Sequence, residues 1–63
     1  MKSVSDMIKS LVDYQFKFGL PEWSDNFVTS ISEKTRNGER TIDLSDKQVA
    51  KIEELYLKYI EDL

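Results

Sequence analysis

The chain has no cysteine and no histidine, and it has only one proline and two glycines. Without cysteine there is no disulfide, thiol nucleophile or thiolate metal site. Without histidine the chain lacks the commonest zinc ligand and the side chain best suited to proton transfer near neutral pH. No Asp-x-Asp-x-Asp-Gly calcium loop is present. A magnesium or calcium site made of carboxylates alone stays open, but with no pattern to support one we expect no metal and no cofactor.

Long hydrophobic runs are also missing. No stretch approaches the roughly 20 apolar residues of a membrane span. The start of the chain, residues 1–6, has polar breaks where a signal peptide needs an apolar run. These features, with the lack of cysteine, lead us to expect a cytoplasmic protein that does not use a membrane. The 63 residues suffice for a single domain, residues 1–63.

The spacing of apolar residues predicts three helices, at about residues 4–18, 21–36 and 46–62. In the first, apolar residues recur every three or four positions, and Gly19 follows as a C-terminal stop. In the second, Trp23, Phe27 and Ile31 form a narrow apolar stripe, which ends at Asn37-Gly38. We expect the connection that follows to be extended, with Ile42 and Leu44 in the core.

The start of the third helix carries the strongest local signal in the chain. Ser45 and Gln48 have the spacing of a capping box, in which each side chain bonds the backbone amide of the other. Leu44 and Val49 have the spacing of a hydrophobic staple. A wide apolar face follows, and Leu57 lies off it. These signals fix where the helix begins.

Three amphipathic helices with short connections predict an all-α fold, a small three-helix bundle. Its expected core comprises Met7, Ile8, Leu11, Phe18, Trp23, Phe27, Ile31, Leu44, Ile52, Leu55, Tyr56 and Tyr59. If Trp23 is central, its replacement by alanine should cost about 3–5 kcal/mol. Such a loss could unfold a domain of this size.

The sequence gives little support to catalysis. Its serines have no histidine to activate them, and it has no glycine-rich phosphate loop. Glu53-Glu54 and Glu61-Asp62 are carboxylate pairs, but sequence neighbours do not share a helix face, which favours a solvated acidic surface. We expect a protein that is not an enzyme and has no catalytic residues.

Positive charge gathers before and within the start of the third helix. The chain has a net charge of −3, but residues 34–51 sum to +2. The candidate phosphate-binding side chains are Lys34, Arg36, Arg40, Lys47 and Lys51. The alternative is an ordinary solvated turn. A helix-turn-helix motif is less favoured, because the connection from Asn37 to Ser45 is long for that motif.

Some aromatic residues lie outside the main stripes or have two interpretations. Tyr14 and Phe16 lie off the main face of the first helix, and burial and an apolar patch for a protein partner are both open for them. Trp23 could stack on unpaired bases, although a tryptophan at helical spacing is more often part of the core.

Four features in order resemble a small helical element of phage replication and recombination proteins: Trp23-x-x-x-Phe27-Val28-x-Ser30-Ile31, a short basic loop around Arg36 and Arg40, Leu44-Ser45-Asp46-Lys47-Gln48, and Ile52-x-x-Leu55-Tyr56-x-Lys58-Tyr59. That element is the accessory domain associated with the UvsW recombination helicase of T-even phages. The resemblance covers roughly residues 20–60, and it rests on helix-start and core signals.

Two hypotheses follow from these patterns. The resemblance implies a non-catalytic accessory module of a phage DNA helicase in recombination and fork repair. Its partner would be that helicase or another replication or recombination protein. Through the basic residues it would also contact single-stranded or branched DNA weakly, in the host-cell cytoplasm. The alternative is a pure protein-interaction module, docking through Tyr14 and Phe16, with no nucleic-acid role.

Overall fold

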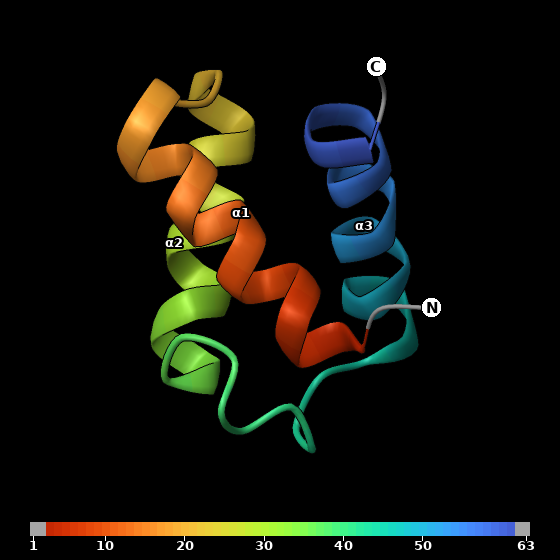
Figure 1. Cartoon of the computed structure of the whole chain (residues 1–63). Helices are drawn as coiled ribbons and strands as arrows, with labels where there is room; N and C mark the ends of the chain where they lie inside the picture. The colour runs from red at the N-terminus through yellow and green to blue at the C-terminus, as the bar shows by residue number, and fades with distance from the viewer. Residues whose placement is uncertain (1–2, 62–63) are drawn as a thin grey trace.

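The computed structural model describes residues 3–61 and shows three helices in a compact bundle (Figure 1). Helix α1 spans Val4–Phe18, α2 spans Glu22–Thr35 and α3 spans Asp46–Tyr56. The last helix continues as a wider π-helical segment, η1, over Leu57–Glu61. The predicted all-α three-helix bundle is therefore confirmed, and the helix bounds agree to within a residue or two wherever the structure describes them.

Helix α1 is the central element of the bundle. It packs against α2 on one side and against α3 and η1 on the other, whereas α2 and α3 approach each other less closely (Figure 1). The core between the helices consists of Met7, Ile8, Leu11, Val28, Ile31, Ile52, Leu55 and Tyr56. All of these side chains except Tyr56 are aliphatic, so the fold is held mainly by branched and unbranched hydrocarbon packing.

Local capping defines where α1 and α3 begin. The Ser3 hydroxyl accepts a bond from the Asp6 amide at 3.1 Å. At α3 the full capping box forms: the Gln48 amide donates to Ser45 Oγ at 3.2 Å, and the Ser45 amide donates to Gln48 Oε1 at 2.9 Å. Each bond pairs a backbone amide that has no partner within its own helix. The capping predictions at Ser3 and Ser45 are confirmed.

The chain leaves α2 through a tight turn. Arg36, Asn37 and Gly38 have φ of 52°, 60° and 95°, in the region that favours glycine. The fully buried Thr35 donates to the Ile31 carbonyl at 2.6 Å and accepts from the Gly38 amide at 3.0 Å. A Cβ at residue 38 would lie 2.8 Å from the Ser5 carbonyl oxygen, so glycine lets this turn pack directly on α1.

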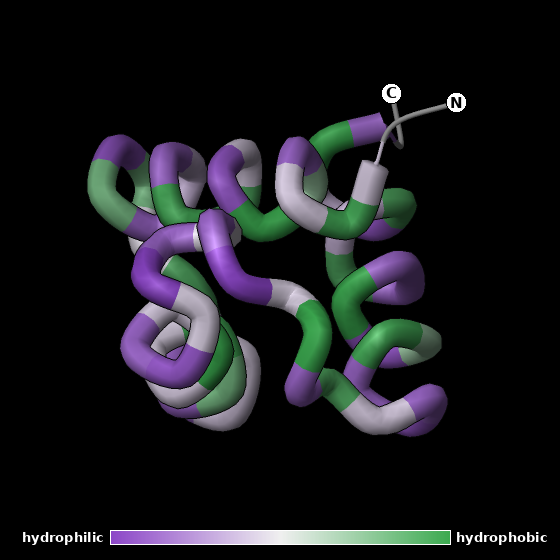
Figure 2. Tube along the Cα trace, turned by 90° about the horizontal axis from the view of Figure 1, so that it is seen from below, coloured by the Kyte–Doolittle hydropathy of each residue, from purple (hydrophilic) through white to green (hydrophobic). Residues whose placement is uncertain are grey.

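After this turn the connection crosses the lower end of the bundle, where hydrophilic and hydrophobic residues mix (Figure 2). Leu44 is half-buried against the core, as expected. Ile42, in contrast, is 84% exposed, so its predicted burial is wrong. The reason is geometric: residues 42 and 43 form a turn that projects away from the helices instead of an extended strand-like link.

Two aromatic residues expected in the core are also exposed. Phe18 is 74% exposed because it stands on the last turn of α1, where its ring packs on Tyr14. Trp23 is 59% exposed because the buried face of α2 is Ser24, Val28, Ile31 and Thr35, which is rotated from the predicted stripe. The predicted burial of Phe18 and Trp23 is therefore wrong, whereas Phe27 and Tyr59 are half-buried against the core.

Hydrogen bonds from Gln15 of α1 favour this rotation of α2, as does the burial of Val28 and Ile31. Its side-chain amide nitrogen donates to Asp25 Oδ1 at 2.6 Å and to Thr29 Oγ1 at 2.9 Å, and it also approaches the Asp25 carbonyl at 3.2 Å. Asp25 and Thr29 therefore turn toward α1. Since residues on a helix advance by about 100° each, the neighbouring positions 24 and 28 then point into the core.

We predict that the buried Thr35 hydroxyl stabilises the α2 turn. Thr35→Val keeps the shape but leaves the buried Gly38 amide without its acceptor, which should lower the free energy of unfolding by about 1–3 kcal/mol. Urea unfolding would measure this loss. In the matched variant Thr35→Ser the hydroxyl stays, so the Gly38 amide should keep its protection from hydrogen exchange. If Thr35→Val is as stable as the native protein, with the same Gly38 protection, the bond is unimportant.

Candidate interaction surfaces

Most aromatic side chains of this protein lie at or near its surface. The chain has one tryptophan, three tyrosines and three phenylalanines, and Tyr56 alone among these seven is buried. Phe16 is 90% exposed, Phe18 74% and Trp23 59%, while the other three are half-buried. Aromatic rings bring large apolar area to an interface at low conformational cost, so these exposed rings are the first candidates for recognition.

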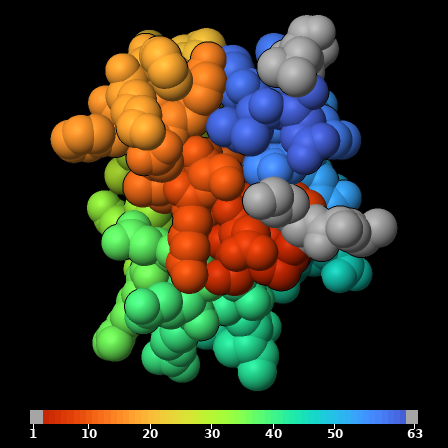
Figure 3. Space-filling model, viewed as in Figure 1, coloured from red at the N-terminus to blue at the C-terminus, as the bar shows by residue number. Residues whose placement is uncertain are grey.

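One group of rings lies where α1 ends beside η1. The Tyr14 ring packs on Phe18, with centroids 5.0 Å apart, and on Tyr59, with centroids 5.6 Å apart. Figure 3 shows this end of α1, in orange, at an upper corner of the molecule, next to the blue C-terminal part of the chain. Tyr14 thus joins α1 to η1 and has a structural role. The Phe18 ring packs on Tyr14 and is itself exposed to solvent.

Phe16 stands apart from Tyr14, although the sequence paired them. Two residues on a helix are separated by about 200°, so their side chains leave α1 on nearly opposite sides. Tyr14 is half-buried and Phe16 is almost fully exposed. The structure therefore does not bring the predicted pair together in one patch. We call Tyr14, Phe16 and Phe18 the aromatic end of α1, with Phe18 beside Tyr14 and Phe16 on the other side.

A second group of rings lies on α2, facing α3. The rings of Trp23 and Phe27 are stacked, with centroids 5.5 Å apart and an interplanar angle of 6°. The Lys51 ammonium of α3 lies 4.7 Å from the centroid of the Trp23 ring, in a cation–π contact. These contacts bridge α2 and α3 where their backbones diverge.

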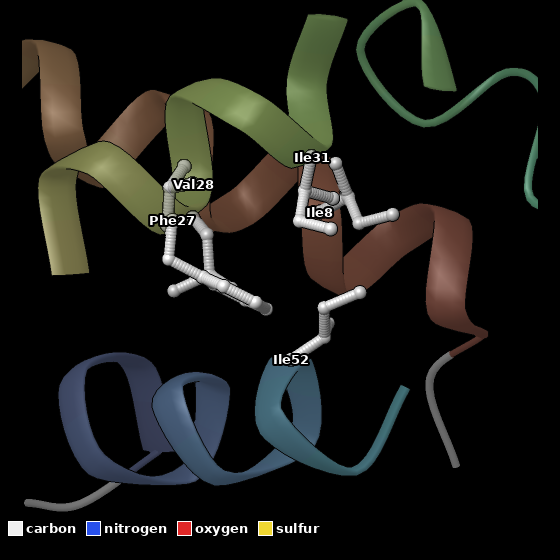
Figure 4. Close-up of a pocket in the computed structure, with 6 residues that line it drawn as sticks. Ile8, Phe27, Val28, Ile31 and Ile52 are labelled. Atoms are coloured by element: carbon white, nitrogen blue, oxygen red, sulfur yellow. The ribbon is translucent and has the colours of Figure 1, made fainter. Parts of the chain in front are cut away.

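Below this bridge is a narrow apolar crevice. It is lined by Ile8, Leu11, Phe27, Val28, Ile31 and Ile52. Figure 4 shows Phe27 reaching from α2 toward α3, and Ile52 rising from α3 toward Ile8 and Ile31. The crevice is too tight to hold a water molecule. It therefore belongs to the packed core, and it is no binding pocket in this conformation.

Four of the predicted basic residues lie near the connection between α2 and α3, whereas Lys51 is one turn further along α3, and the five differ in their contacts. Lys34 donates to Gln48 Oε1 at 3.3 Å, which joins α2 to the capping box of α3. Lys51 contacts Trp23 and pairs with Glu54 at 2.5 Å. Arg36, Arg40 and Lys47 are exposed. Lys34 and Lys51 thus serve the contact between α2 and α3.

Acidic residues offset most of the positive charge in residues 33–51. Glu33, Glu39, Asp43 and Asp46 are interspersed with the five basic residues, so residues 33–51 sum to only +1. All four carboxylates are exposed. Counterion release is the main source of non-specific affinity for DNA, and a net charge this small provides little of it.

Two ionisable groups of α3 have shifted pKa values with clear causes. The hydrogen bond and charge of Lys51 hold the pKa of the exposed Glu54 carboxyl below its ordinary value. Burial raises the pKa of the Tyr56 hydroxyl, and its 3.1 Å bond to Glu61 adds to the effect. Burial and neighbouring charged or hydrogen-bonding side chains account for both shifts.

The part of the chain that the structure describes contains no group of three or more acidic side chains placed to hold a metal ion. Within residues 3–61, no helix combines the length and apolar character needed to cross a bilayer. Searches against models of protein families, curated proteins and solved structures found no match to this chain. The resemblance to the UvsW-associated domain therefore stays a prediction.

Sequence reasoning missed the surface where Trp23, Phe27 and Lys51 meet. The signal was present in part, because Trp23 and Phe27 are one turn apart on a helix. The same spacing also fits a core stripe. Only the burial of Ser24 and Val28 shows that this pair lies at the edge of the core instead of its centre.

We predict that Trp23 contributes less stability than a core residue does. Trp23→Ala should lower the free energy of unfolding by about 1–2 kcal/mol, since more than half of the side chain already contacts water. Ile52→Ala, at a position only 1% exposed, should cost about 2–5 kcal/mol and provides the comparison. Urea titrations of both variants measure the difference. Equal losses would place Trp23 among the core residues.

Proposed function

We propose that this protein is a non-catalytic protein-interaction module. The observation that carries the proposal is the surface placement of its aromatic residues: three are more than half exposed, while the buried core is almost entirely aliphatic. Exposed aromatic side chains that gather into a patch, as Phe18 does with Tyr14, are typical of a site where another protein docks. Burial and neighbouring charges account for the two pKa shifts described above, as expected for a protein that binds a partner without catalysing a reaction.

The aromatic end of α1 is the surface that we assign to the partner. Phe16 and Phe18 are both free to be covered, and Tyr14 supports Phe18 from below through its contact with Tyr59. The two rings leave α1 on different sides, so a partner that covers both must wrap around the end of the helix. The packed bundle holds these rings in place before binding, which lowers the entropic cost of association.

The resemblance suggests the class of partner. If the chain is an accessory module of the UvsW type, its partner is a DNA helicase that acts in recombination and replication-fork repair. ATP hydrolysis would then reside in that partner, and both proteins would work in the host-cell cytoplasm. Another replication or recombination protein would fit the same surface.

We predict that a purified UvsW-type helicase binds this protein through the aromatic end. Isothermal titration calorimetry should give a Kd that rises at least tenfold in the double variant Phe16→Ser plus Phe18→Ser, because the exposed rings supply the apolar contact. The matched control is Ile42→Ser, which removes an equally exposed apolar side chain from the other end of the bundle.

The single variants Phe16→Ser and Phe18→Ser show which side of α1 is covered. Neither should unfold the domain, since both side chains are mostly in water. An unchanged Kd in the double variant would reject this surface. Absence of binding by the native protein would reject the helicase as the partner.

Direct contact with DNA is the second candidate function. It is favoured by one observation, the exposure of Arg36, Arg40 and Lys47 at the same end of the bundle. The neighbouring carboxylates weaken it, and Lys34 and Lys51 already have partners within the protein. We therefore assign DNA a supporting role, in which a weak, salt-sensitive contact adds to a protein-held complex.

We predict weak binding to short single-stranded or forked DNA, with a Kd that rises steeply with salt. Arg36→Glu plus Arg40→Glu should abolish it at low salt, because two attractive charges become repulsive. Lys9→Glu plus Lys17→Glu makes the same change of charge on α1 and should retain more of the affinity. An NMR titration at low and moderate salt provides the measurement. Affinity that both double variants reduce equally would mean that overall charge, and no defined site, governs binding.

A further inference from the structure

The turn that follows α2 contains the sequence Asn37-Gly38, for which the proposed function has no use. An asparagine followed by glycine can cyclise: the glycine nitrogen attacks the side-chain carbonyl carbon of the asparagine, and ammonia leaves. Glycine allows this attack more readily than other residues, because it has no side chain to hinder its nitrogen and its backbone rotates freely. The sequence therefore contains a site at which the chain can modify itself.

The structure exposes one of the two reacting groups and buries the other. Asn37 is exposed, whereas Gly38 is buried against α1. The Gly38 amide donates to the Thr35 hydroxyl at 3.0 Å, and this buried hydroxyl donates in turn to the Ile31 carbonyl at 2.6 Å. A nitrogen whose proton is bonded inside the protein neither loses that proton to solvent nor turns toward Asn37 Cγ. The bond to Thr35 must break before the attack can occur.

Further contacts hold the backbone on both sides of the reacting pair. The Asn37 amide donates to the Ser32 carbonyl at 2.8 Å, and the Arg40 amide donates to the Thr35 carbonyl at 2.8 Å. A Cβ built at residue 38 would lie only 2.8 Å from the Ser5 carbonyl oxygen, so the glycine backbone is packed directly on α1. Rotation of the Gly38 nitrogen toward Asn37 would disrupt this packing. The reaction therefore requires the turn to open.

We propose that Asn37 is a site of spontaneous deamidation, that the bond from Gly38 to Thr35 controls its rate, and that the isoaspartate product holds the turn open. In the open turn the Gly38 nitrogen bonds to Asn37 Cγ, its proton passes to water, and the side-chain nitrogen leaves as ammonia. Water then opens the cyclic imide at either carbonyl, which gives aspartate or isoaspartate. The whole reaction consumes water and releases ammonia, and residue 37 becomes negatively charged.

The isoaspartate form cannot fit the native turn. Its backbone runs through the former side chain, which adds a methylene group just before Gly38. The bonds from Gly38 and Arg40 back to Thr35 both span this point, and Gly38 has no free space against α1. The added carboxylate also lowers the charge of residues 33–51 from +1 to zero. The inference does not depend on the proposed function, since the aromatic end of α1 lies at the opposite end of the bundle (Figure 1).

Incubation of the whole chain in mildly alkaline buffer, folded and in denaturing urea, is the first test. Ion exchange separates the product because deamidation adds a negative charge, and peptide mass spectrometry identifies the residue. We expect Asn37 to react at least tenfold more slowly in the folded protein than in urea. Asn26, the other asparagine, precedes the bulky Phe27 and should react far more slowly than Asn37 in urea. Equal rates at Asn37 with and without urea would reject the proposal.

Two variants of Thr35 test its control of the rate. Thr35→Val removes the acceptor of the Gly38 amide and should speed deamidation in the folded protein about tenfold, as the loss of a buried hydrogen bond implies. Thr35→Ser keeps the hydroxyl and should react at nearly the native rate. Hydrogen exchange at the Gly38 amide should rise in parallel, because it needs the same opening. Faster exchange in Thr35→Val without faster deamidation would contradict the proposal.

Core variants separate opening of the turn from unfolding of the whole domain. Ile52→Val and Ile52→Ala remove buried carbon atoms of α3 and weaken the domain without removing a bond of the turn. Their stabilities and that of Thr35→Val are measured by urea unfolding. At equal stability, Thr35→Val should deamidate faster. Equal rates at equal stability would show that only global unfolding exposes the site, and the role assigned to Thr35 would be wrong.

The purified product tests the effect of the modification on the turn. The isoaspartate form should lose hydrogen-exchange protection at the amides of Gly38 and Arg40. Asn37→Asp is the matched control, because it adds the same charge without lengthening the backbone, and it should keep that protection. If the isoaspartate form is as well protected as Asn37→Asp, the turn accommodates the extra methylene and the proposed effect is refuted.

Discussion

The side-chain amide of Gln15 joins α1 to α2, and its bonds favour the rotation of α2 that leaves Trp23 at the surface. By bonding Asp25 and Thr29, Gln15 turns one edge of α2 toward α1. Ser24 and Val28 then enter the core, while Trp23 moves to the edge that faces α3. This polar contact and the burial of Val28 and Ile31 in the core favour the same rotation of α2.

A second constraint acts at the other end of α2. Thr35 and Gly38 hold the chain in a turn that packs on α1, which returns the chain to the start of α3. The positive φ of Arg36 and Asn37 is part of this turn and costs conformational energy. The Arg36 side chain therefore extends from a backbone of fixed conformation, and Arg40 lies four residues later in the chain. The positions of Arg36 and Arg40 therefore depend on the buried hydrogen bonds of Thr35, which involve no charged group.

Features that depend on residues close in the sequence were predicted well, whereas features that depend on contacts between helices were not. Capping at Ser3 and Ser45 involves residues three apart, so the sequence contains all of its information. The choice between two stripes on α2 depends on a bond from another helix, and apolar periodicity cannot decide it. Ile42 shows the same limit, because alternation of polar and apolar residues says nothing about a turn that projects outward. The contacts of Lys34 with Gln48 and of Lys51 with Trp23 join different helices, so the spacing of the candidate basic residues could not predict them.

The centre of the core and the exposed rings are formed by different side chains. Ile8, Leu11 and Ile52 are almost completely buried and make the centre of the core, whereas Phe16, Phe18 and Trp23 are more than half exposed. An exposed ring on a small protein favours self-association unless a partner covers it.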